Sequence, residues 1–288
     1  MSLRNRLRNR PIILAPGICD ALTATLATQA GAEALYLSGA AIAYTRLGRP
    51  DIGLVTMSEV AETITLVRDR VPTPLIVDAD NGYGNALNMQ RTMRLFERAG
   101  ANVLQIEDQS YPKRCGHLDE KRLISQTEMV GKLKAAADAR QSRETLIIAR
   151  TDAVAVEGFA AAIERAEAYA EAGADILFVE APGSRSELEK VPRALAGRLP
   201  LMANMVDGGK TPITSAGELE AIGFSLVIFP GAIVRAMAHA AQALYATLLA
   251  DGTTDAFRSK MFDFHALNAV IGTPEMLALG KTYEGDPR

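Results

Sequence analysis

The feature of this sequence that most restricts its fold is a short junction that occurs four times. Each copy reads as the end of a helix, then a glycine, then a strand: QAGAEALYL, RAGANVLQI, EAGADILFV and AIGFSLVIF. Their glycines, Gly31, Gly100, Gly173 and Gly223, stand where helices commonly end in a left-handed residue. A helix that passes through such a turn into a strand belongs to a βα unit, so the repeat predicts alternating strands and helices.

Eight short apolar runs rich in Ile, Leu and Val extend this alternation along the chain, as expected of parallel strands buried on both faces. They cover Pro11–Ala15, Ala34–Leu37, Leu75–Val77, Val103–Ile106, Leu146–Ala149, Ile176–Val179, Leu201–Ala203 and Leu226–Phe229. Eight βα units predict an α/β fold, a (β/α)₈ TIM barrel. The alternative is a doubly wound open sheet, which usually has fewer strands and a glycine-rich first turn that APGICDAL matches poorly.

Capping boxes predict the starts of four helices, at Thr56/Glu59, Ser125/Glu128, Ser184/Glu187 and Ser215/Glu218. After the eighth strand, Ala232–Leu249 and Thr254–Ala269 read as two helices, whereas a barrel needs one. We therefore expect one barrel domain over residues 1–288 whose C-terminal helical extension, about 232–288, packs on a neighbouring subunit.

Composition narrows the class of protein. A formal net charge of −3 in 288 residues gives no electrostatic reason to expect nucleic acid or an anionic membrane as a partner. No run is apolar enough to span a bilayer, and two cysteines make no disulfide framework. The basic start, MSLRNRLRNRP, has no apolar segment of a secretory signal; we favour a short helix packed on the domain over a transit segment. A cytoplasmic protein is expected.

Polar residues follow nearly every predicted strand, which is where a barrel carries its chemistry. They are Ser38 and Gly39, Asp78 and Asp80, Glu107 and Asp108, Arg150 and Asp152, Glu180, Asn204, and Pro230 and Gly231. Each alone could be a helix cap or a solvated loop residue. Seven groups that converge on one mouth predict a polar active site.

Charge sorts these residues by role. Asp78 and Asp80 are one residue apart at a strand end, so alternation points both the same way, and with Glu107 they form an anionic cluster. Carboxylates with room for water suit Mg²⁺, with Mn²⁺ possible, although a solvated Asp-rich turn is the alternative. Arg150 is a cation directed into the mouth, to bind a carboxylate or phosphate or to neutralise Glu180 or Asp152.

Two of the predicted βα loops, Ala41–Thr56 and Gln109–Ile124, are longer than a connection requires, as lids usually are. The second contains Lys113, Arg114, Cys115, Gly116 and His117. Two cations beside a cysteine favour its thiolate, so we interpret Cys115 as an acid, base or nucleophile. His117 has no second ligand nearby and is a weak metal-site candidate. Cys19, in the first βα loop, is interpreted as structural.

With KRCGH at Lys113–His117, the sequence resembles the isocitrate lyase/phosphoenolpyruvate mutase superfamily over essentially its whole length. The motifs are YLSGAA at Tyr36–Ala41, RPDIGL at Arg49–Leu54, VDADNGYGNA at Val77–Ala86, IEDQ…PKRCGH at Ile106–His117, IARTDA at Ile148–Ala153, FVEAP at Phe178–Pro182 and NMVDGGKTP at Asn204–Pro212. The last of these motifs is similar to the short-chain branch that includes 2,3-dimethylmalate lyase, oxaloacetate hydrolase and carboxyphosphonoenolpyruvate mutase.

The resemblance implies specific roles for site residues. Metal is expected at Asp78, Asp80 and Glu107, mostly through water, with Asp51 close by. Cys115, Glu180 and Arg150 are the implied catalytic residues, with Cys115 as the lyases' acid/base. Substrate is expected to meet Tyr36, Ser38, Gly39, Ala40, Asp51, Lys113, Arg114, Gly116, His117, Arg150, Glu180, Asn204 and Arg235.

The implied function is a Mg²⁺-dependent oxo-acid lyase that cleaves a 2-hydroxy, alkylmalate- or methylisocitrate-like acid to a 2-oxo acid and a carboxylic acid. The alternatives are a carboxyphosphonoenolpyruvate phosphonomutase, an oxaloacetate hydrolase or decarboxylase, and a silent barrel that only binds metabolites. Cys115 favours carbon–carbon cleavage, because the phosphonopyruvate-forming mutases typically lack it. The resemblance also implies homotetramers of dimers in which the last barrel helix is swapped.

Overall fold

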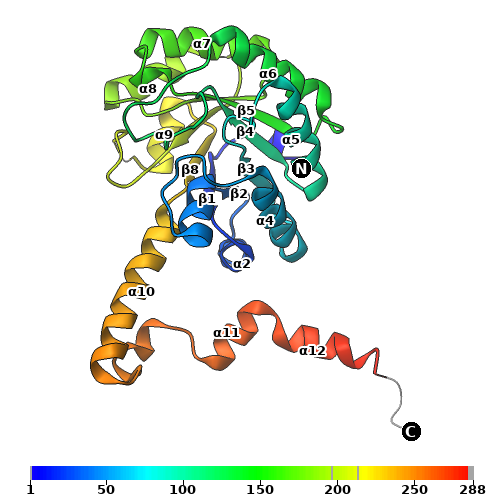
Figure 1. Ribbon diagram of the computed structural model, residues 1–288, viewed down its shortest axis with the longest axis vertical. Helices are drawn as coiled ribbons and strands as arrows, with labels where there is room; N and C mark the ends of the chain where they lie inside the picture. The colour runs from blue at the N-terminus through cyan, green and yellow to red at the C-terminus, as the bar shows by residue number, and fades with distance from the viewer. Residues whose placement is uncertain (1, 196, 213, 285–288) are drawn as a thin grey trace. The chain divides into compact units, whose positions relative to one another are not determined.

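Eight parallel strands close into a barrel in the computed structural model, which describes residues 2–195, 197–212 and 214–284. Each strand pairs with the next, and the first pairs with the last (Figure 1). The strands are β1 Ile13–Ile18, β2 Leu35–Leu37, β3 Leu75–Asp78, β4 Val103–Glu107, β5 Leu146–Thr151, β6 Ile176–Val179, β7 Leu201–Asn204 and β8 Leu226–Phe229. The predicted (β/α)₈ TIM barrel is confirmed.

Helices follow the strands and cover the outside of the barrel (Figure 1). In chain order they are α1 Leu3–Arg6, α2 Ala21–Gln29, α3 Gly39–Ile42, the π-helical turn η1 Ala43–Leu47, α4 Met57–Arg70, α5 Ala86–Ala99, α6 Gln126–Ala139, the 3₁₀ turn η2 Ala153–Ala155, α7 Phe159–Glu171, α8 Arg185–Ala194 and α9 Ala216–Ile222. The boxes at Thr56/Glu59 and Ser215/Glu218 are complete, whereas Ser125 and Ser184 accept only the forward bond, from Glu128 and Glu187.

Two apolar layers stabilise the barrel. The outer layer packs the helices on the strands, and the inner layer fills the barrel with alternate strand residues such as Ile76, Ile148 and Phe178. Leu7, only 3% exposed, belongs to the inner layer and follows α1. The N-terminal segment therefore packs on the domain, as predicted.

The chain forms two compact units, one ending at Val234 and the other starting at Arg235. The second unit comprises most of α10 Ala232–Asp251, then the 3₁₀ turn η3 Asp255–Lys260, α11 Phe264–Ile271 and α12 Thr273–Lys281. The single helix predicted over Thr254–Ala269 is wrong. Asp263 ends it early, because its carboxylate accepts from the Ala266 N–H at 2.7 Å and caps a new helix. Within the described residues, no helix has the length and apolarity needed to cross a bilayer.

Candidate active site

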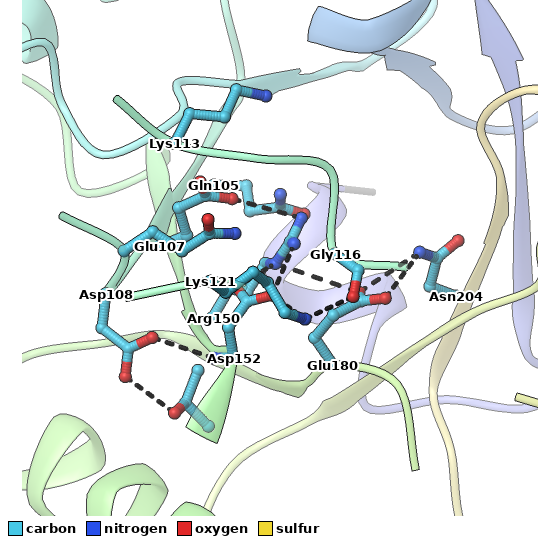
Figure 2. A network of polar contacts seen from close by, with 12 residues as sticks. Gln105, Glu107, Asp108, Lys113, Gly116, Lys121, Arg150, Asp152, Glu180 and Asn204 are labelled. Atoms are coloured by element: carbon cyan, nitrogen blue, oxygen red, sulfur yellow. Dashed lines mark hydrogen bonds and ion pairs between the residues drawn. The ribbon is translucent and has the colours of Figure 1, made fainter. Parts of the chain in front are cut away.

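The polar side chains at the strand ends occupy the same alternating face as the inner apolar layer. Tyr36, Ile76, Ile148, Phe178 and Met202 fill the barrel, and the residues two positions later are Ser38, Asp78, Arg150, Glu180 and Asn204. Parallel register adds Glu107, whose Cα pairs with that of Arg150 across β4 and β5. The barrel therefore directs one polar side chain from most of its strands into a common mouth (Figure 2).

Asp78 and Asp80 converge on Gly39. A Cβ added to Gly39 would lie 3.4 Å from Asp78 Oδ2 and 3.3 Å from Asp80 Oδ1, so a side chain there would press against both carboxylates. The prediction that both carboxylates face one way holds, but not because of strand alternation. β3 ends at Asp78, and Asp80 has a left-handed φ of 47° with its N–H donating to Asp78 Oδ1.

Lys113 lies between two of the carboxylates. Its Nζ is 2.5 Å from Asp51 Oδ1 and 2.7 Å from Asp80 Oδ1, and its side chain is buried. Burial raises the pKa of Asp80 to about 7 although the Lys113 ammonium opposes it. In this conformation Lys113, which was expected to meet substrate, neutralises the acidic cluster instead.

The acidic cluster fits a hard divalent cation. Glu107 Oε1 is buried and has no hydrogen-bond partner among the described residues, and Asp78 and Asp80 supply further carboxylate oxygens, the ligands that hard cations prefer. Burial also raises the pKa of Glu107 well above its usual range, so a cation that favours the ionised form would offset that cost. No three His, Cys, Asp or Glu side chains of the described chain are grouped closely enough to hold a metal directly. Coordination partly through water fits this spacing.

Arg150 is held by its own strand end. Its Nε and Nη2 donate to the two oxygens of Asp152 at 2.9 and 3.0 Å, and its Nη1 lies 3.3 Å from Glu107 Oε2. The predicted pairing of Arg150 with Asp152 is present, and contact of Arg150 with a substrate carboxylate or phosphate stays a prediction. Burial would lower the pKa of Arg150, but Asp152, Glu107 and Glu180 raise it well above its usual range.

Asp108, which was predicted to converge on the mouth with Glu107, instead faces the helix α7 on the outside of the barrel. Asp108 is fully buried, and its carboxylate accepts from the Asp152 N–H at 2.9 Å and from Thr151 Oγ1 at 2.7 Å. Tyr169 and Arg165 on α7 donate to its Oδ2 at 2.8 and 3.2 Å. Asp108 thus anchors the backbone that presents Asp152. The available signal was its place next to Glu107, because successive residues at a strand end point to opposite faces.

The lid, residues 109–124, closes over the mouth. The Cys115 N–H donates to the Asp51 carbonyl at 3.2 Å, and a Cβ on Gly116 would lie 2.5 Å from Arg150 Nη2. The interpretation of Cys115 as a ready thiolate is wrong for this conformation. Burial raises the pKa of its thiol. The Lys113 ammonium is paired with Asp51 and Asp80 instead of with the sulfur.

His117 connects the lid to two strand ends. Its Nε2 lies 3.1 Å from Glu180 Oε1, and its Nδ1 accepts from the Lys210 N–H at 3.0 Å. The accepted bond places the ring proton on Nε2, facing the carboxylate. Asn204 Nδ2 donates to Glu180 Oε2 at 3.2 Å. His117 and the GGK segment of NMVDGGKTP therefore belong to one closed-lid contact, and His117 faces a carboxylate.

Two predicted substrate contacts, Arg114 and Tyr36, make other bonds in this conformation, and a third, Arg235, stays untested. Arg114 does not face the mouth, because its guanidinium bonds Glu120 Oε2 at 2.8 Å on the exposed side of the lid. Tyr36 lies inside the barrel, where its hydroxyl donates to Gln105 Oε1 at 3.0 Å. Arg235 opens the helical unit, so its assignment to the site stays a prediction.

A cavity of about 480 Å³ adjoins the acidic cluster. Asp80 and Lys113 form part of its wall, and the rest is mostly apolar, including Leu54, Met57 and Tyr83. An apolar cavity beside a carboxylate-rich mouth suits a ligand with both carboxylate and alkyl parts.

Comparison with known proteins gives a consistent result. Residues 3–249 match the family described as phosphoenolpyruvate phosphomutase. The chain is 39% identical over 281 residues to the 2,3-dimethylmalate lyase of Eubacterium barkeri, which covers 98% of this chain and 96% of the relative. It is 46% identical over 270 residues to the 2-methylisocitrate lyase of Aeropyrum pernix, covering 94% and 86%.

Solved structures show the same architecture. A 2,3-dimethylmalate lyase crystal structure has a TM-score of 0.93 at 36% identity, covering 98% of this chain and 94% of that chain. A phosphonopyruvate hydrolase in complex with oxalate and Mg²⁺ has a TM-score of 0.88 at 29% identity, covering 98% and 97%.

Proposed function

We propose that this chain, which belongs to the phosphoenolpyruvate phosphomutase family, cleaves a carbon–carbon bond of a 2-hydroxy acid. The acid is of alkylmalate or methylisocitrate type, and a divalent metal assists the cleavage. The enzyme is an oxo-acid lyase, as its named relatives are. The proposed carbon–carbon cleavage rests on Cys115. This cysteine lies in a lid, and the next residue, Gly116, packs on Arg150 and Glu180 at the strand ends.

The reaction follows from the side chains of the mouth. Arg150 and the backbone N–H groups of Gly39 and Ala40, in the first turn of α3, bind the substrate carboxylates, whereas the Ser38 N–H already donates to the Ile18 carbonyl. The hydroxyl proton leaves to a carboxylate of the site, C2 becomes the carbonyl of the 2-oxo acid, and the C2–C3 electron pair passes to C3. The Cys115 thiol then protonates C3 and completes the carboxylic acid product. A raised thiol pKa supports this role, because it keeps the proton on sulfur until the carbanion forms.

Magnesium is the metal proposed, with Mn²⁺ as the alternative. Asp78 and Asp80 would hold it, with Glu107 and Asp51 acting through water. When bound, it would lower the pKa of the substrate hydroxyl and neutralise charge on the forming 2-oxo acid. The support is the buried oxygen of Glu107 without a partner and the Mg²⁺ in the related hydrolase complex.

A phosphonomutase is the second candidate, and the family description itself favours it. The site would bind a phosphorus-bearing acid through the same cations. Cys115 argues against this candidate, because transfer of a phosphorus group requires no carbon protonation. The proposed assembly is a homotetramer built from dimers that exchange the last barrel helix, and the proposed location is the cytoplasm.

The test is an assay of the purified protein with Mg²⁺ against 2-methylisocitrate, 2,3-dimethylmalate, other 2-alkylmalates, isocitrate and oxaloacetate. Release of a 2-oxo acid is followed, with oxalate measured for oxaloacetate. One substrate should react, and Cys115→Ser should reduce kcat by about a hundredfold or more. Cys19→Ser is the matched control, because Cys19 is buried beside Thr23 outside the lid. If no substrate releases a 2-oxo acid or oxalate while Mg²⁺ is still bound, the lyase proposal is rejected, and phosphorus-bearing acids become the next substrates to assay.

A further inference from the structure

Lys121 is a buried cation at the end of the lid that the proposed reaction does not use. Its side chain is 1% exposed. Its Nζ donates to the Gly116 carbonyl and, at 3.0 Å, to Asp152 Oδ1 (Figure 2). A buried ammonium persists only when its charge is paired and its protons have acceptors. Lys121 therefore connects the centre of the lid to the end of β5.

The position of this connection matters more than its strength. Gly116 follows Cys115 directly, so the carbonyl that Lys121 binds is on the residue next to Cys115. That peptide has no freedom to settle deeper, since a Cβ on Gly116 would lie 2.7 Å from Glu180 Cγ. The contact of Gly116 with Glu180 and the hydrogen bond from Lys121 together fix the position of Cys115 over the mouth.

Asp152 is shared between the lid and the substrate cation. Its Oδ1 accepts from both Lys121 Nζ and Arg150 Nη2, each at 3.0 Å. Asp152 itself cannot shift, because its backbone N–H is bonded to the buried Asp108. The carboxylate that orients Arg150 is thus the one that receives the closing lid.

Charge gives the second consequence of closure. Three carboxylates, those of Glu107, Asp152 and Glu180, lie against the guanidinium of Arg150. Lys121 adds a second cation on Asp152 and so reduces the negative charge around Arg150. An anionic substrate is therefore bound more favourably when Lys121 is in place.

We propose that Lys121 is a positioning residue that clasps the lid to Asp152, setting Cys115 over the mouth and linking lid closure to the orientation of Arg150. The inference rests on the proposed function for its purpose, but its contacts do not depend on which substrate is cleaved.

The test measures access to Cys115 rather than turnover. The full-length protein is treated with iodoacetamide, and alkylation of the Cys115 peptide is followed by mass spectrometry, with and without Mg²⁺ and oxalate. Lys121→Met keeps the length of the side chain and removes the charge. Its Cys115 should react at least about tenfold faster than that of the wild type, since removing one partner of a buried ion pair is strongly unfavourable. Addition of Mg²⁺ and oxalate should slow Cys115 alkylation less in Lys121→Met than in the wild type.

Lys210→Met is the matched control. Lys210 Nζ also pairs with the lid, at 2.6 Å from Asp119 Oδ1, but on the exposed side, where an ion pair contributes little. Its effect on alkylation should stay below about threefold. Lys121→Arg, which keeps the cation, should restore much of the wild-type protection and guards against a folding defect in Lys121→Met.

Two outcomes reject the clasp: a Lys121→Met rate equal to that of the wild type, or equal effects of Lys121→Met and Lys210→Met. Each could occur in an active lyase. Conversely, faster alkylation of Lys121→Met in a protein that cleaves none of the assayed acids would support the clasp while the proposed function fails.

Discussion

Cys115 is placed to give up a proton. Burial has the largest effect on the pKa of its thiol and raises it. The backbone of His117 and the charge of Arg150 lower this pKa, whereas Asp51 and Glu180 raise it further. Lys113 lies on the carboxylates of Asp51 and Asp80 and is no partner for a thiolate. A thiol that stays protonated at neutral pH is a suitable acid for a carbanion, and a poor nucleophile until its proton has left.

The protonation state of Cys115 can be measured directly. Because only the thiolate reacts with iodoacetamide, the rate of Cys115 alkylation against pH should reach half its maximum above the pH found for glutathione in parallel. The sign follows from the raised pKa, which moves thiolate formation to higher pH. Cys19→Ser serves as the background, so that one cysteine reports. A midpoint below that of glutathione would restore the thiolate interpretation.

Sequence reasoning located the site residues better than it oriented them. Arg150 and Glu180 follow the buried Ile148 and Phe178 by two residues, so strand alternation correctly predicted that they face the mouth. Alternation does not apply once a strand ends. Lys113 and Arg114 are neighbours in sequence, yet one is buried against Asp80 and the other bonds exposed Glu120, because the turns of the lid decide their directions.

At the scale of elements, the lid is a separately folded loop that fits the mouth at one small residue. It is tied at its base by the bridge between Gln109 and Leu123, and at its centre Gly116 packs on Arg150 and Glu180. Its identity as a lid was predictable from its length and its place after a barrel strand. Its anchors were not, since Asp51 and Asp152 are distant in sequence and only the closed barrel brings them together.

Gly116→Ala should prevent the lid from seating. The added Cβ would lie 2.5 Å from Arg150 Nη2 and 2.8 Å from Glu180 Cδ, and neither side chain can move freely because both are buried in ion pairs. We expect kcat/KM to fall by about a hundredfold, since misplacement of about 1 Å has this effect. The melting temperature should change little, because the clash is relieved by opening the lid.

Gly131→Ala is the matched control for Gly116→Ala. Gly131 lies inside α6 with open space around a built Cβ, so alanine there should leave kcat/KM unchanged and stabilise the fold by about 0.5–1 kcal/mol. Thermal denaturation and steady-state kinetics on both variants separate the two effects. Full activity in Gly116→Ala would mean that the lid closes in another way.

For the whole molecule, the sequence predicted the barrel well and the helical unit poorly. The βα junctions are local signals, and Gly100 and Gly223 do cap their helices with φ of 106° and 116°. The unit beginning at Arg235 has no such repeat. Its second predicted helix is interrupted at Asp263, and α12 after Gly272 was not predicted. Helices that lack a core of their own give a weaker periodic signal than helices packed on a sheet.

The helical unit supplies the last prediction, which concerns assembly. Thirteen of its large apolar side chains are exposed within one chain, among them Phe264 at 78% and Leu277 at 64%, and of its described apolar residues only Phe257 is buried. From this exposed apolar surface we predict contact with another copy of the chain. Phe264→Glu should lower the mass measured by light scattering at micromolar concentration. A glutamate in the first turn of α11 favours the helix itself, so the loss would come from the interface. Burying a phenylalanine contributes about 1.5–3 kcal/mol, and a symmetric dimer has two copies, so the dissociation constant should rise by roughly a hundredfold or more.

Gln242→Glu adds the same charge at an exposed polar position of α10 and should leave the mass unchanged. A monomeric wild type, or a Phe264→Glu protein of wild-type mass at every concentration, would contradict assembly through this face.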